Sequence, residues 1–456
     1  MPGEEAAAAA VSIALFTRDL RVHDNPVLRG AADSERVVPL FVLDDGITRS
    51  GFLRPNRVSF LVQCLADVDA GLRERGGRLV IRRGPVVEEV RRVAAETGAG
   101  KVHVAADVSG YAQRRQDALA RALAEDGREL VVHEAVVTAV PPGRITPQGG
   151  DHFAVFTPYY RRWVDQPMRR PLDPPGRLQL PRIRAGAVPR AGELCDGEPS
   201  PDVVPGGERE ARRRLDGWRR TVSRYAENSD LLAADGTSRL SPYLHFGCLS
   251  AIEIIHRVGN GSPGAEAFVR QVAWRDFHHQ VLAARPTSAH RDHRGHGDRW
   301  RRDDQALRAW REGHTGYPVV DAGMCQLAAE GWMHNRARLI VGSFLTKTLY
   351  LDWRLGARHF LDLLVDGDIA NNQMNWQWIA GTGTDTRPNR VLNPLAQARR
   401  YDPEGDYVRR YIPELAGIEG AAVHEPWKLD GLDYPAPIVD LDEGRERFRA
   451  ARSTQH

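Results

Sequence analysis

The first 135 residues alternate short β-branched runs with segments of helical periodicity, and this alternation constrains the fold more than any other feature. The strand-like runs are VSIALF, VVPLFVL, RLVIRR, KVHVAA and ELVVHE. Strands separated by helices pair in parallel through right-handed crossovers, so we expect an α/β N-terminal domain with an open, mostly parallel five-stranded sheet in residues 1–135. Ligands of such sheets bind beyond the carboxyl ends of the strands, where loops begin near Arg18, Asp44 and Asp107.

Two further regions follow the predicted sheet. Residues 136–205 are rich in proline, glycine and arginine, which predicts an interdomain linker over the surface. The FTPYYRRW motif (156–163) is typical of a packed aromatic clip that anchors such a linker. Helical periodicity dominates residues 206–456 and predicts an all-α C-terminal domain. A chain of 456 residues is long enough for two domains with sizeable cores.

Composition narrows the cellular setting. The net charge of +3 is too small to announce a nucleic-acid partner, although it can hide a basic face. The four cysteines lack metal or redox spacing, which fits a reducing cytosol, and we expect a cytoplasmic protein without disulfides.

No apolar run approaches the ~20 residues that span a bilayer, and the Ala6 to Ala10 run lacks the basic flank of a signal peptide. His290, His293 and His296 lack partners at zinc spacing, so we expect no metal site.

The stretch DGDIANNQMNWQW (366–378) concentrates acidic, amide and indole side chains. Asp368, Asn372 and Trp376 recur at a spacing of four, which places them along one side of a helix. Carboxylate and amide oxygens accept from ring N-H groups, an amide also donates, and an indole packs beside a ring, so the set suits a flat, polar heteroaromatic ligand. The same residues fit a solvated turn followed by core tryptophans, and taken alone they favour this second interpretation.

The motif GWMHNRARL (331–339) favours the ligand site. On a helix Asn335, Arg338 and Leu339 fall at i, i+3 and i+4 and share a face. We expect Arg338 to form a charge-assisted pair with a nearby carboxylate such as Asp366, beside the ligand.

Hydroxyl groups gather in TSRLSPYLHFG (237–247). Ser241 looks like an N-cap with proline at the next position, and Thr237 and Ser238 precede it. The free N-H groups and the dipole of a helix N-terminus favour a pyrophosphate, but capping alone explains these residues equally well. Further along, Ser250 and Glu253 look like a capping box.

Several more motifs occur in order along the chain: RDLRVHDNP (18–26), WRDFHHQ (274–280), TGYPVVDAGM (315–324) and HEPWK (424–428). Together the motifs resemble the photolyase/cryptochrome family of flavoproteins, most closely the class I cyclobutane pyrimidine dimer photolyases of the deazaflavin type. The resemblance implies an all-α domain that binds FAD and, when the FAD is reduced and excited by blue or near-UV light, repairs pyrimidine dimers by electron transfer. It implies a deoxyribodipyrimidine photo-lyase that acts on UV-damaged DNA, as a monomer and without a membrane.

The resemblance also assigns residues to the cofactor. Trp376, Trp353 and Trp300 match the family's tryptophan chain, which carries electrons between the surface and the flavin. Asn372 matches the position that faces the flavin N5 atom. The positions that match FAD contacts are Tyr225, Thr237, Ser238, Arg239, Leu240, Ser241, Gln271, Arg275, Asn335, Arg338, Asp366, Gly367, Asp368 and Asn372.

A second set of positions matches the substrate site. Gln271, Trp274 and His278 fall at i, i+3 and i+7 on one helix face, where a dimer flipped out of the duplex would find an aromatic wall and polar edges. Dimer photolyases usually carry Glu in place of Gln271 and Met in place of Leu339, and these departures affect efficiency more than identity. The positions that match substrate or DNA contacts are Gln271, Trp274, His278, Asn335, Arg336, Leu339, Trp378, Arg390 and Gln397.

Two other functions within the family stay open: a cryptochrome-like blue-light photoreceptor and, less favoured, a (6-4) photolyase. The (6-4) enzymes use histidines at the positions of Asn335 and Leu339, and Gln271 alone points toward them. A photoreceptor with a long signalling tail is not expected, because the chain ends soon after HEPWK.

The family also uses a second chromophore as a light-harvesting antenna. Folate binders present a glutamate near the position of Gly110, whereas deazaflavin binders place Phe, Arg, Asp and Lys around the ring. This chain has Phe41, Arg57, Asp107 and, in the lysine position, His245. We therefore expect 8-hydroxy-5-deazaflavin rather than methenyltetrahydrofolate between the domains, although His245 is cationic only when protonated.

Overall fold

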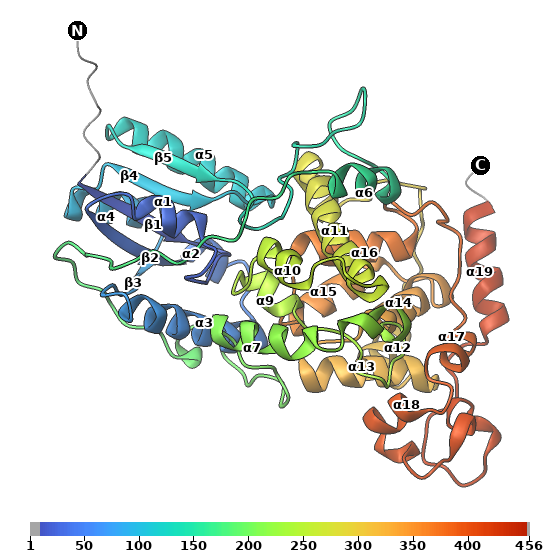
Figure 1. The fold of residues 1–456 in the computed structure, drawn as a ribbon. Helices are drawn as coiled ribbons and strands as arrows, with labels where there is room; N and C mark the ends of the chain where they lie inside the picture. The colour runs from blue at the N-terminus through green and yellow to red at the C-terminus, as the bar shows by residue number, and fades with distance from the viewer. Residues whose placement is uncertain (1–9, 454–456) are drawn as a thin grey trace.

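Five parallel strands form the sheet that the sequence predicts. The computed structural model describes residues 10–453, so most of the alanine run at 6–10 lies outside it. The strands pair in the order β3-β2-β1-β4-β5, and every pair is parallel. Figure 1 shows the sheet and its helices as one lobe of the molecule and the helical residues as the other. The strands are β1 (Val11–Phe16), β2 (Arg36–Asp44), β3 (Val80–Gly84), β4 (Lys101–Ala105) and β5 (Glu129–His133).

Helices cover both faces of the sheet. Alternate residues of a strand point to opposite faces, so neighbouring residues pack against different helices. Leu15 of β1 belongs to a buried cluster with Val90 of α4, whereas the next residue, Phe16, belongs to a second cluster with Val68 of α3. The sheet is therefore buried on both faces. The helices of this domain are α1 (Pro26–Ala31), α2 (Asp45–Thr48), α3 (Pro55–Arg73), α4 (Val86–Thr97) and α5 (Gly110–Glu125).

The linker contains α6 (Phe156–Val164) and a 3-10 turn (Ala191–Glu193). Tyr159 and Trp163 of α6 are buried, and the Trp163 indole Nε1 donates to Asp276 Oδ2 at 3.0 Å. Burial raises the pKa of Asp276 to about 6, despite the counteracting charge of Arg275 and the hydrogen bonds that the carboxylate accepts. The FTPYYRRW motif is thus a packed aromatic clip, as the sequence predicts.

The C-terminal domain is helical throughout, as expected. Its long helix α11 packs against α16, α8 and α6, so it connects the linker to the interior of this domain (Figure 1). The helices are α7 (Glu208–Arg219), α8 (Tyr225–Asn228), α9 (Ser241–Phe246), α10 (Ala251–Val258), α11 (Pro263–Ala284), α12 (Asp304–Glu312), α13 (Pro318–Glu330), α14 (Asn335–Ser343), α15 (Trp353–Leu363), α16 (Ile369–Ala380), α17 (Pro394–Tyr401), α18 (Asp406–Tyr411) and α19 (Leu441–Ser453). A π-helical turn (Phe344–Thr348) follows α14, and 3-10 turns occur at Val222–Arg224, Pro286–Ala289, Pro413–Leu415, Gly420–His424 and Pro426–Lys428.

The predicted cap at Ser241 is wrong by one residue. Leu240 occupies the N-cap of α9, and Ser241 is the first helical residue, whose hydroxyl accepts from Trp332 Nε1 at 3.1 Å. Ser250 does cap α10, since its hydroxyl accepts from the backbone N-H of Glu253 at 2.8 Å. The Glu253 carboxylate instead pairs with Arg257 on the same helix, at 3.1 Å.

The two domains meet closely where the loop after β1 reaches the end of α9. Buried Arg21 donates to the carbonyl of Gly247 at 2.9 Å. Gly247 has a φ of +70°, and an added Cβ would lie 1.9 Å from the carbonyl oxygen of Arg18, so glycine alone fits this contact. The close approach brings the Arg18 side chain against the helical domain.

Among residues 10–453, no helix is long and apolar enough to cross a membrane. Within the same residues, no group of three or more His, Cys, Asp or Glu side chains is arranged to hold a metal ion. His293 instead packs edge-on against His152, with ring centroids 5.9 Å apart.

Candidate functional site

The segment from 366 onward forms a tight turn followed by α16, so the predicted spacing of four is realised on a helix. Asp368 is the N-cap, and its Oδ1 accepts from the backbone N-H of Asn371 at 2.7 Å. Asn372 and Trp376 follow within α16, and both are buried. Gly367 lies against Arg57 of the other domain, so the turn sits at the domain junction.

Arg338 and Asp366 form the expected ion pair. The Arg338 Nη2 atom lies 2.8 Å from Asp366 Oδ2, and Arg338 Nε donates to the carbonyl of Met333 at 2.9 Å. The second oxygen, Asp366 Oδ1, is buried and has no hydrogen-bond partner among the described residues. A buried acceptor in this state indicates a missing donor.

The segment 237–241 lies against the same part of the molecule. Trp332, which donates to Ser241, also lies beneath the guanidinium of Arg239, 4.5 Å from its ring centroid. The loop that carries Trp332 is tied to Asp366 through its neighbour, because Val365 N donates to the Gly331 carbonyl at 2.8 Å. Trp332 is a component of the site that the spacing of sequence motifs did not reveal.

These segments fit a polar heteroaromatic ligand such as a flavin nucleotide. Thr237 Oγ1, like Asp366 Oδ1, is a buried oxygen with no partner in the described part of the chain. Asn372 Nδ2 donates to the carbonyl of Ala357 at 3.1 Å and to Gln373 Oε1 at 3.2 Å, which fixes its amide within α16. The site therefore combines a fixed amide with two buried oxygens that have no partner within the part of the chain that the structure describes.

Tyr225 lies at the start of α8 in an aromatic group. Its ring is edge-on to Trp218 and to Phe268, at centroid distances of 5.8 and 5.4 Å. Burial raises the pKa of Tyr225, so the hydroxyl stays protonated at neutral pH.

Asp368 and Arg275, both expected at the flavin, belong to a buried charged cluster at the domain junction. Arg18 from the N-terminal domain pairs with Asp368 Oδ2 and, at 3.2 Å, with Asp107. Arg275 donates to the carbonyl of Val137 at 2.6 Å. Burial would raise the pKa of Asp368, but Arg18 and the neighbouring His279 outweigh it and hold the pKa well below its usual range.

Two of the three tryptophans of the expected electron-transfer chain are buried, and the third is partly exposed. Trp376 is buried between Phe360 and Trp310, and its ring contacts α15 at Gly356, where an added Cβ would lie 2.2 Å from it. Trp353 begins α15 one turn before that contact and is fully buried, with Nε1 donating to Asp292 at 2.8 Å. Trp300 is only partly buried.

The three predicted substrate residues Gln271, Trp274 and His278 all lie within helix α11. Gln271 is exposed and Trp274 is partly buried, whereas His278 is buried and bonded through Nδ1 to Asn371 Oδ1 at 3.1 Å. Burial lowers the pKa of His278 to about 4, so it is neutral at neutral pH. On α16, Trp378 is partly buried beneath the Arg390 guanidinium, which lies 5.7 Å from its ring centroid.

Phe156 of the linker is a further component that sequence reasoning missed. Its ring stacks on Trp274 with a centroid distance of 3.7 Å and an interplanar angle of 8°. The guanidinium of Arg270 lies 5.1 Å from the Phe156 centroid. The FTPYYRRW motif signalled packing but gave no indication of which helix it would meet.

The remaining predicted substrate positions lie on α14, α17 and the segment before α17. Asn335 is exposed and Leu339 is partly buried on α14. Arg336 pairs with Asp230 at 2.6 Å, and Gln397 Oε1 is a buried oxygen without a partner among the described residues.

The four predicted antenna residues are buried or nearly so at the domain junction. Arg57 donates to the carbonyl of Leu364 at 2.7 Å, and its guanidinium lies 4.5 Å from the centroid of Phe52. Burial lowers the pKa of Arg57 to about 10, so it remains cationic. Burial also lowers the pKa of His245, which opposes the positive charge expected there. Phe41 of β2 is buried, and Asp107 is partly buried and pairs with Arg18.

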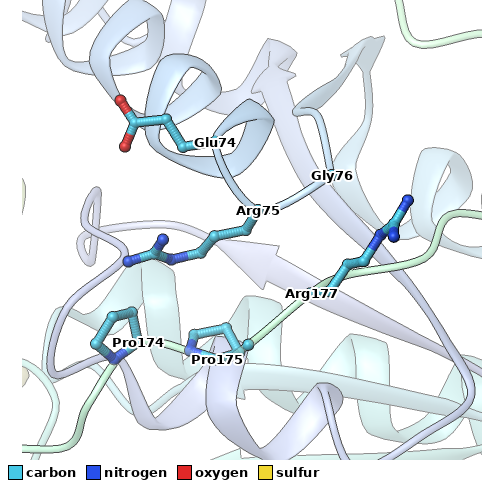
Figure 2. Close-up of a pocket in the computed structure, with 7 residues that line it drawn as sticks. Glu74, Arg75, Gly76, Pro174, Pro175 and Arg177 are labelled. Atoms are coloured by element: carbon cyan, nitrogen blue, oxygen red, sulfur yellow. The ribbon is translucent and has the colours of Figure 1, made fainter.

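Two cavities lie outside the flavin segments. One, of about 350 Å³, borders Asp107 at the carboxyl ends of β4 and β5 and reaches Ala283 of α11. The other, of about 520 Å³, lies between the end of α3 and the linker, and Figure 2 shows the side chains of Arg75 and Arg177 beside two prolines there. None of the predicted site residues lines this second cavity.

The combination of an α/β domain, a helical domain and this polar site is typical of a two-domain flavoprotein, and comparison with protein families identifies the class. Residues 12–176 match the family model described as DNA photolyase, and residues 268–454 match the model described as the FAD binding domain of DNA photolyase. The chain belongs to the DNA photolyase family.

Individual relatives cover nearly the whole chain. A deoxyribodipyrimidine photo-lyase of Streptomyces griseus is 59% identical over 452 residues, which are 97% of this chain and 99% of that protein. A bacterial class III photolyase from Agrobacterium tumefaciens superposes with a TM-score of 0.91 at 32% identity, covering 99% of each chain. An archaeal photolyase from Sulfolobus tokodaii, solved with two FAD molecules, superposes with a TM-score of 0.88 at 30% identity, covering 97% of this chain and 100% of that one.

Proposed function

We propose that the chain is a light-dependent deoxyribodipyrimidine photo-lyase that converts cyclobutane pyrimidine dimers in DNA back to separate pyrimidines. The observation that carries the proposal is the 59% identity, along nearly the full length of both chains, to the Streptomyces griseus deoxyribodipyrimidine photo-lyase. Exposed amides and partly buried tryptophans on α11, α14 and α16 support it, since a flipped dimer needs polar edge partners and aromatic walls. We further expect a cytoplasmic monomer of class I.

FAD would be held by the residues around Asp366. Thr237 and Asp366 offer buried oxygens that lack donors among residues 10–453, and Asn372 presents an amide fixed within α16. When bound in its reduced form and excited by light, FAD supplies the electron that opens the dimer. The Arg338 guanidinium, fixed by Asp366, places a positive charge that favours an electron-rich ring nearby.

Trp274 and Trp378 would form the walls of the dimer site. Phe156 supports Trp274 through face-to-face stacking, and Arg390 lies over Trp378. The amides of Gln271 and Asn335 both donate and accept, so they suit the polar edges of two pyrimidines.

Arginines beside this site would bind the DNA backbone. Arg390 is exposed, and Arg336 is partly buried beside Asp230. Binding through phosphates releases counterions, so the affinity for damaged DNA should fall with rising salt.

Electrons would pass from Trp300 at the surface through Trp353 and Trp376 to oxidised FAD. The burial of these tryptophans supports Trp300 as the surface end, since Trp376 and Trp353 are buried and Trp300 is only partly buried. Trp353 is further fixed by the hydrogen bond to Asp292.

For the antenna we propose 8-hydroxy-5-deazaflavin, bound near Phe41, Arg57, Asp107 and His245. Arg57 supplies the cation that an anionic deazaflavin needs, while His245 stays neutral at neutral pH. Protein from a host that makes no deazaflavin should contain FAD alone, and added 8-hydroxy-5-deazaflavin should then give a new absorption band and a matching action spectrum for repair. Tight binding of methenyltetrahydrofolate, or no response to deazaflavin, would overturn this assignment.

An illuminated repair assay on two lesions tests the proposed function. We expect purified protein to show flavin absorption and to repair a cyclobutane thymine dimer in light but not in the dark. A matched duplex with a (6-4) lesion should remain unrepaired. Repair of the (6-4) lesion alone would favour the (6-4) photolyase, and flavin photochemistry without repair of either lesion would favour a photoreceptor.

A further inference from the structure

Lys347 is a buried lysine whose ammonium contacts the segment that carries Arg390. It lies in the π-helical turn after α14 and is 2% exposed. The Lys347 Nζ atom donates to the carbonyl oxygens of Pro388 and Arg390, at 2.8 and 2.7 Å. Only three of the 63 basic residues of the chain are lysines, and Lys347 is the buried one among them.

Ser343 holds the same segment one helical turn earlier. Its hydroxyl accepts from the backbone N-H of Leu392 at 3.0 Å. Ser343 and Lys347 are four residues apart and therefore share a face. Together they bind three residues of this segment, at positions 388, 390 and 392, and the segment begins with a turn closed by the hydrogen bond from Arg390 N to the Arg387 carbonyl.

Gly381 packs against the same Pro388 carbonyl oxygen that accepts from Lys347. An added Cβ on Gly381 would lie 2.4 Å from the carbonyl oxygen of Pro388, and the φ of Gly381 is +79°. The backbone of 388–392 is thus held by contacts with Lys347, Ser343 and Gly381, while Arg390 remains exposed and its guanidinium lies over Trp378.

The charges around Lys347 set the stability of this contact. Asp385 attracts the ammonium, Arg390 and Arg452 repel it, and the ring of Phe448 from α19 lies 5.6 Å from Nζ. Burial outweighs these charges and lowers the pKa of Lys347 to about 7. The two carbonyl bonds therefore weaken when the ammonium loses its proton near neutral pH.

We propose that Lys347 is a positioning residue for nucleic-acid binding, whose ammonium fixes segment 388–392 so that Arg390 and Trp378 meet DNA in a defined geometry. The inference rests on the proposed function, because it assigns Arg390 to the DNA backbone.

The test is a comparison of Lys347→Met with Lys101→Met, a matched change at a partly exposed lysine that pairs with Glu129 on the sheet. Lys347→Met should weaken binding to a dimer-containing duplex about tenfold, because two buried carbonyls lose their donor. FAD content and the repair rate at saturating DNA should stay at the wild-type value, and Lys101→Met should bind DNA like the wild type.

Two further readouts separate positioning from general destabilisation. The double variant Lys347→Met/Arg390→Ala should bind DNA no more weakly than Arg390→Ala alone, because the segment then carries no contact to position. Wild-type affinity should decrease between pH 6 and pH 9, beyond the decrease of the Lys347→Met variant. Additive losses, or equal pH profiles, would overturn the proposal.

Hydrogen exchange of the free protein tests the anchor without DNA. The amide of Leu392 should exchange faster in Lys347→Met than in the wild type, and unchanged exchange would overturn the proposal. If Lys347→Met does not fold, Lys347→Gln serves the same measurement with a neutral donor. Wild-type protein that neither binds nor repairs dimers would refute the proposed function instead, and the exchange result would still decide whether Lys347 fixes this segment.

Discussion

Asp366 and Asp368 lie two residues apart and each pairs with an arginine, yet the two carboxylates have different surroundings. Asp368 uses both oxygens within the protein, because Oδ2 pairs with Arg18 from the other domain and Oδ1 accepts from Asn371. Asp366 pairs with Arg338 through Oδ2 and keeps Oδ1 buried without a partner in the described residues. Contacts within the protein satisfy the first carboxylate, whereas the second keeps an acceptor that a ligand can use.

The largest effect should come from Asp368→Asn. Asparagine still caps α16 but removes one of the two buried carboxylates, Asp368 and Asp107, that pair with Arg18 at the domain junction. We expect the free energy of unfolding to fall by about 3 kcal/mol, as measured by urea denaturation. The more solvent-accessible pair of Arg54 and Asp362 also joins the domains, so Asp362→Asn is the control and should change stability by less than about 1 kcal/mol. Equal stability of both variants would remove the distinction between the two aspartates.

Acid should reproduce part of this loss. The folded state holds the pKa of Asp368 well below that of an unfolded aspartate, so the stabilisation is present above about pH 4 and is lost as pH falls through the folded pKa. The unfolding free energy measured between pH 3 and pH 7 should therefore decrease toward acid more steeply for the wild type than for Asp368→Asn. Parallel curves would show that Asp368 carries no such stabilising charge interaction.

Asp366→Asn should act on the ligand rather than on the domain junction. It removes the charge that fixes Arg338 and alters the free oxygen, so FAD affinity should fall about tenfold. The unfolding free energy of the apoprotein should fall less than in Asp368→Asn. Fluorescence titration with FAD measures the affinity, and wild-type affinity would contradict the assignment of Asp366 to the flavin.

The smallest effect should come from the Phe156 ring that stacks on Trp274 beside the proposed dimer site. Phe156→Leu keeps an apolar side chain but removes the stacked ring behind Trp274, so the dissociation constant for dimer-containing DNA should rise about fivefold. Phe156→Tyr preserves the ring and should bind like the wild type. Equal affinity of the leucine variant, measured by fluorescence anisotropy, would mean that Trp274 holds its position without this contact.

Sequence reasoning reached the parts of the molecule that local pattern determines. The five strands follow from β-branched runs, and the Arg338 to Asp366 pair follows from helical spacing and charge. The prediction of an N-cap at Ser241 was wrong by one residue. Leu240 occupies the cap position, and the Ser241 hydroxyl accepts a hydrogen bond from Trp332.

Contacts between residues far apart in the sequence could not be predicted from local patterns. Arg18 and Asp368 are 350 positions apart, and the stack of Phe156 on Trp274 joins the linker to α11. The Lys347 contact depends on a π-helical turn that no spacing of polar residues announces. In each case the partner is chosen by tertiary packing, which a single sequence does not encode as a local pattern.

The most direct measurement is a crystal structure of the protein with FAD and a duplex that contains a thymine dimer. The proposed arrangement predicts flavin within hydrogen-bond distance of Asp366 Oδ1 and beside Asn372, with the flipped dimer between Trp274 and Trp378 and its edges on Gln271 and Asn335. Arg18 should remain on Asp368. A flavin beyond the reach of both Asp366 and Asn372, or a dimer bound away from the two tryptophans, would contradict the assignment of this face as the repair site.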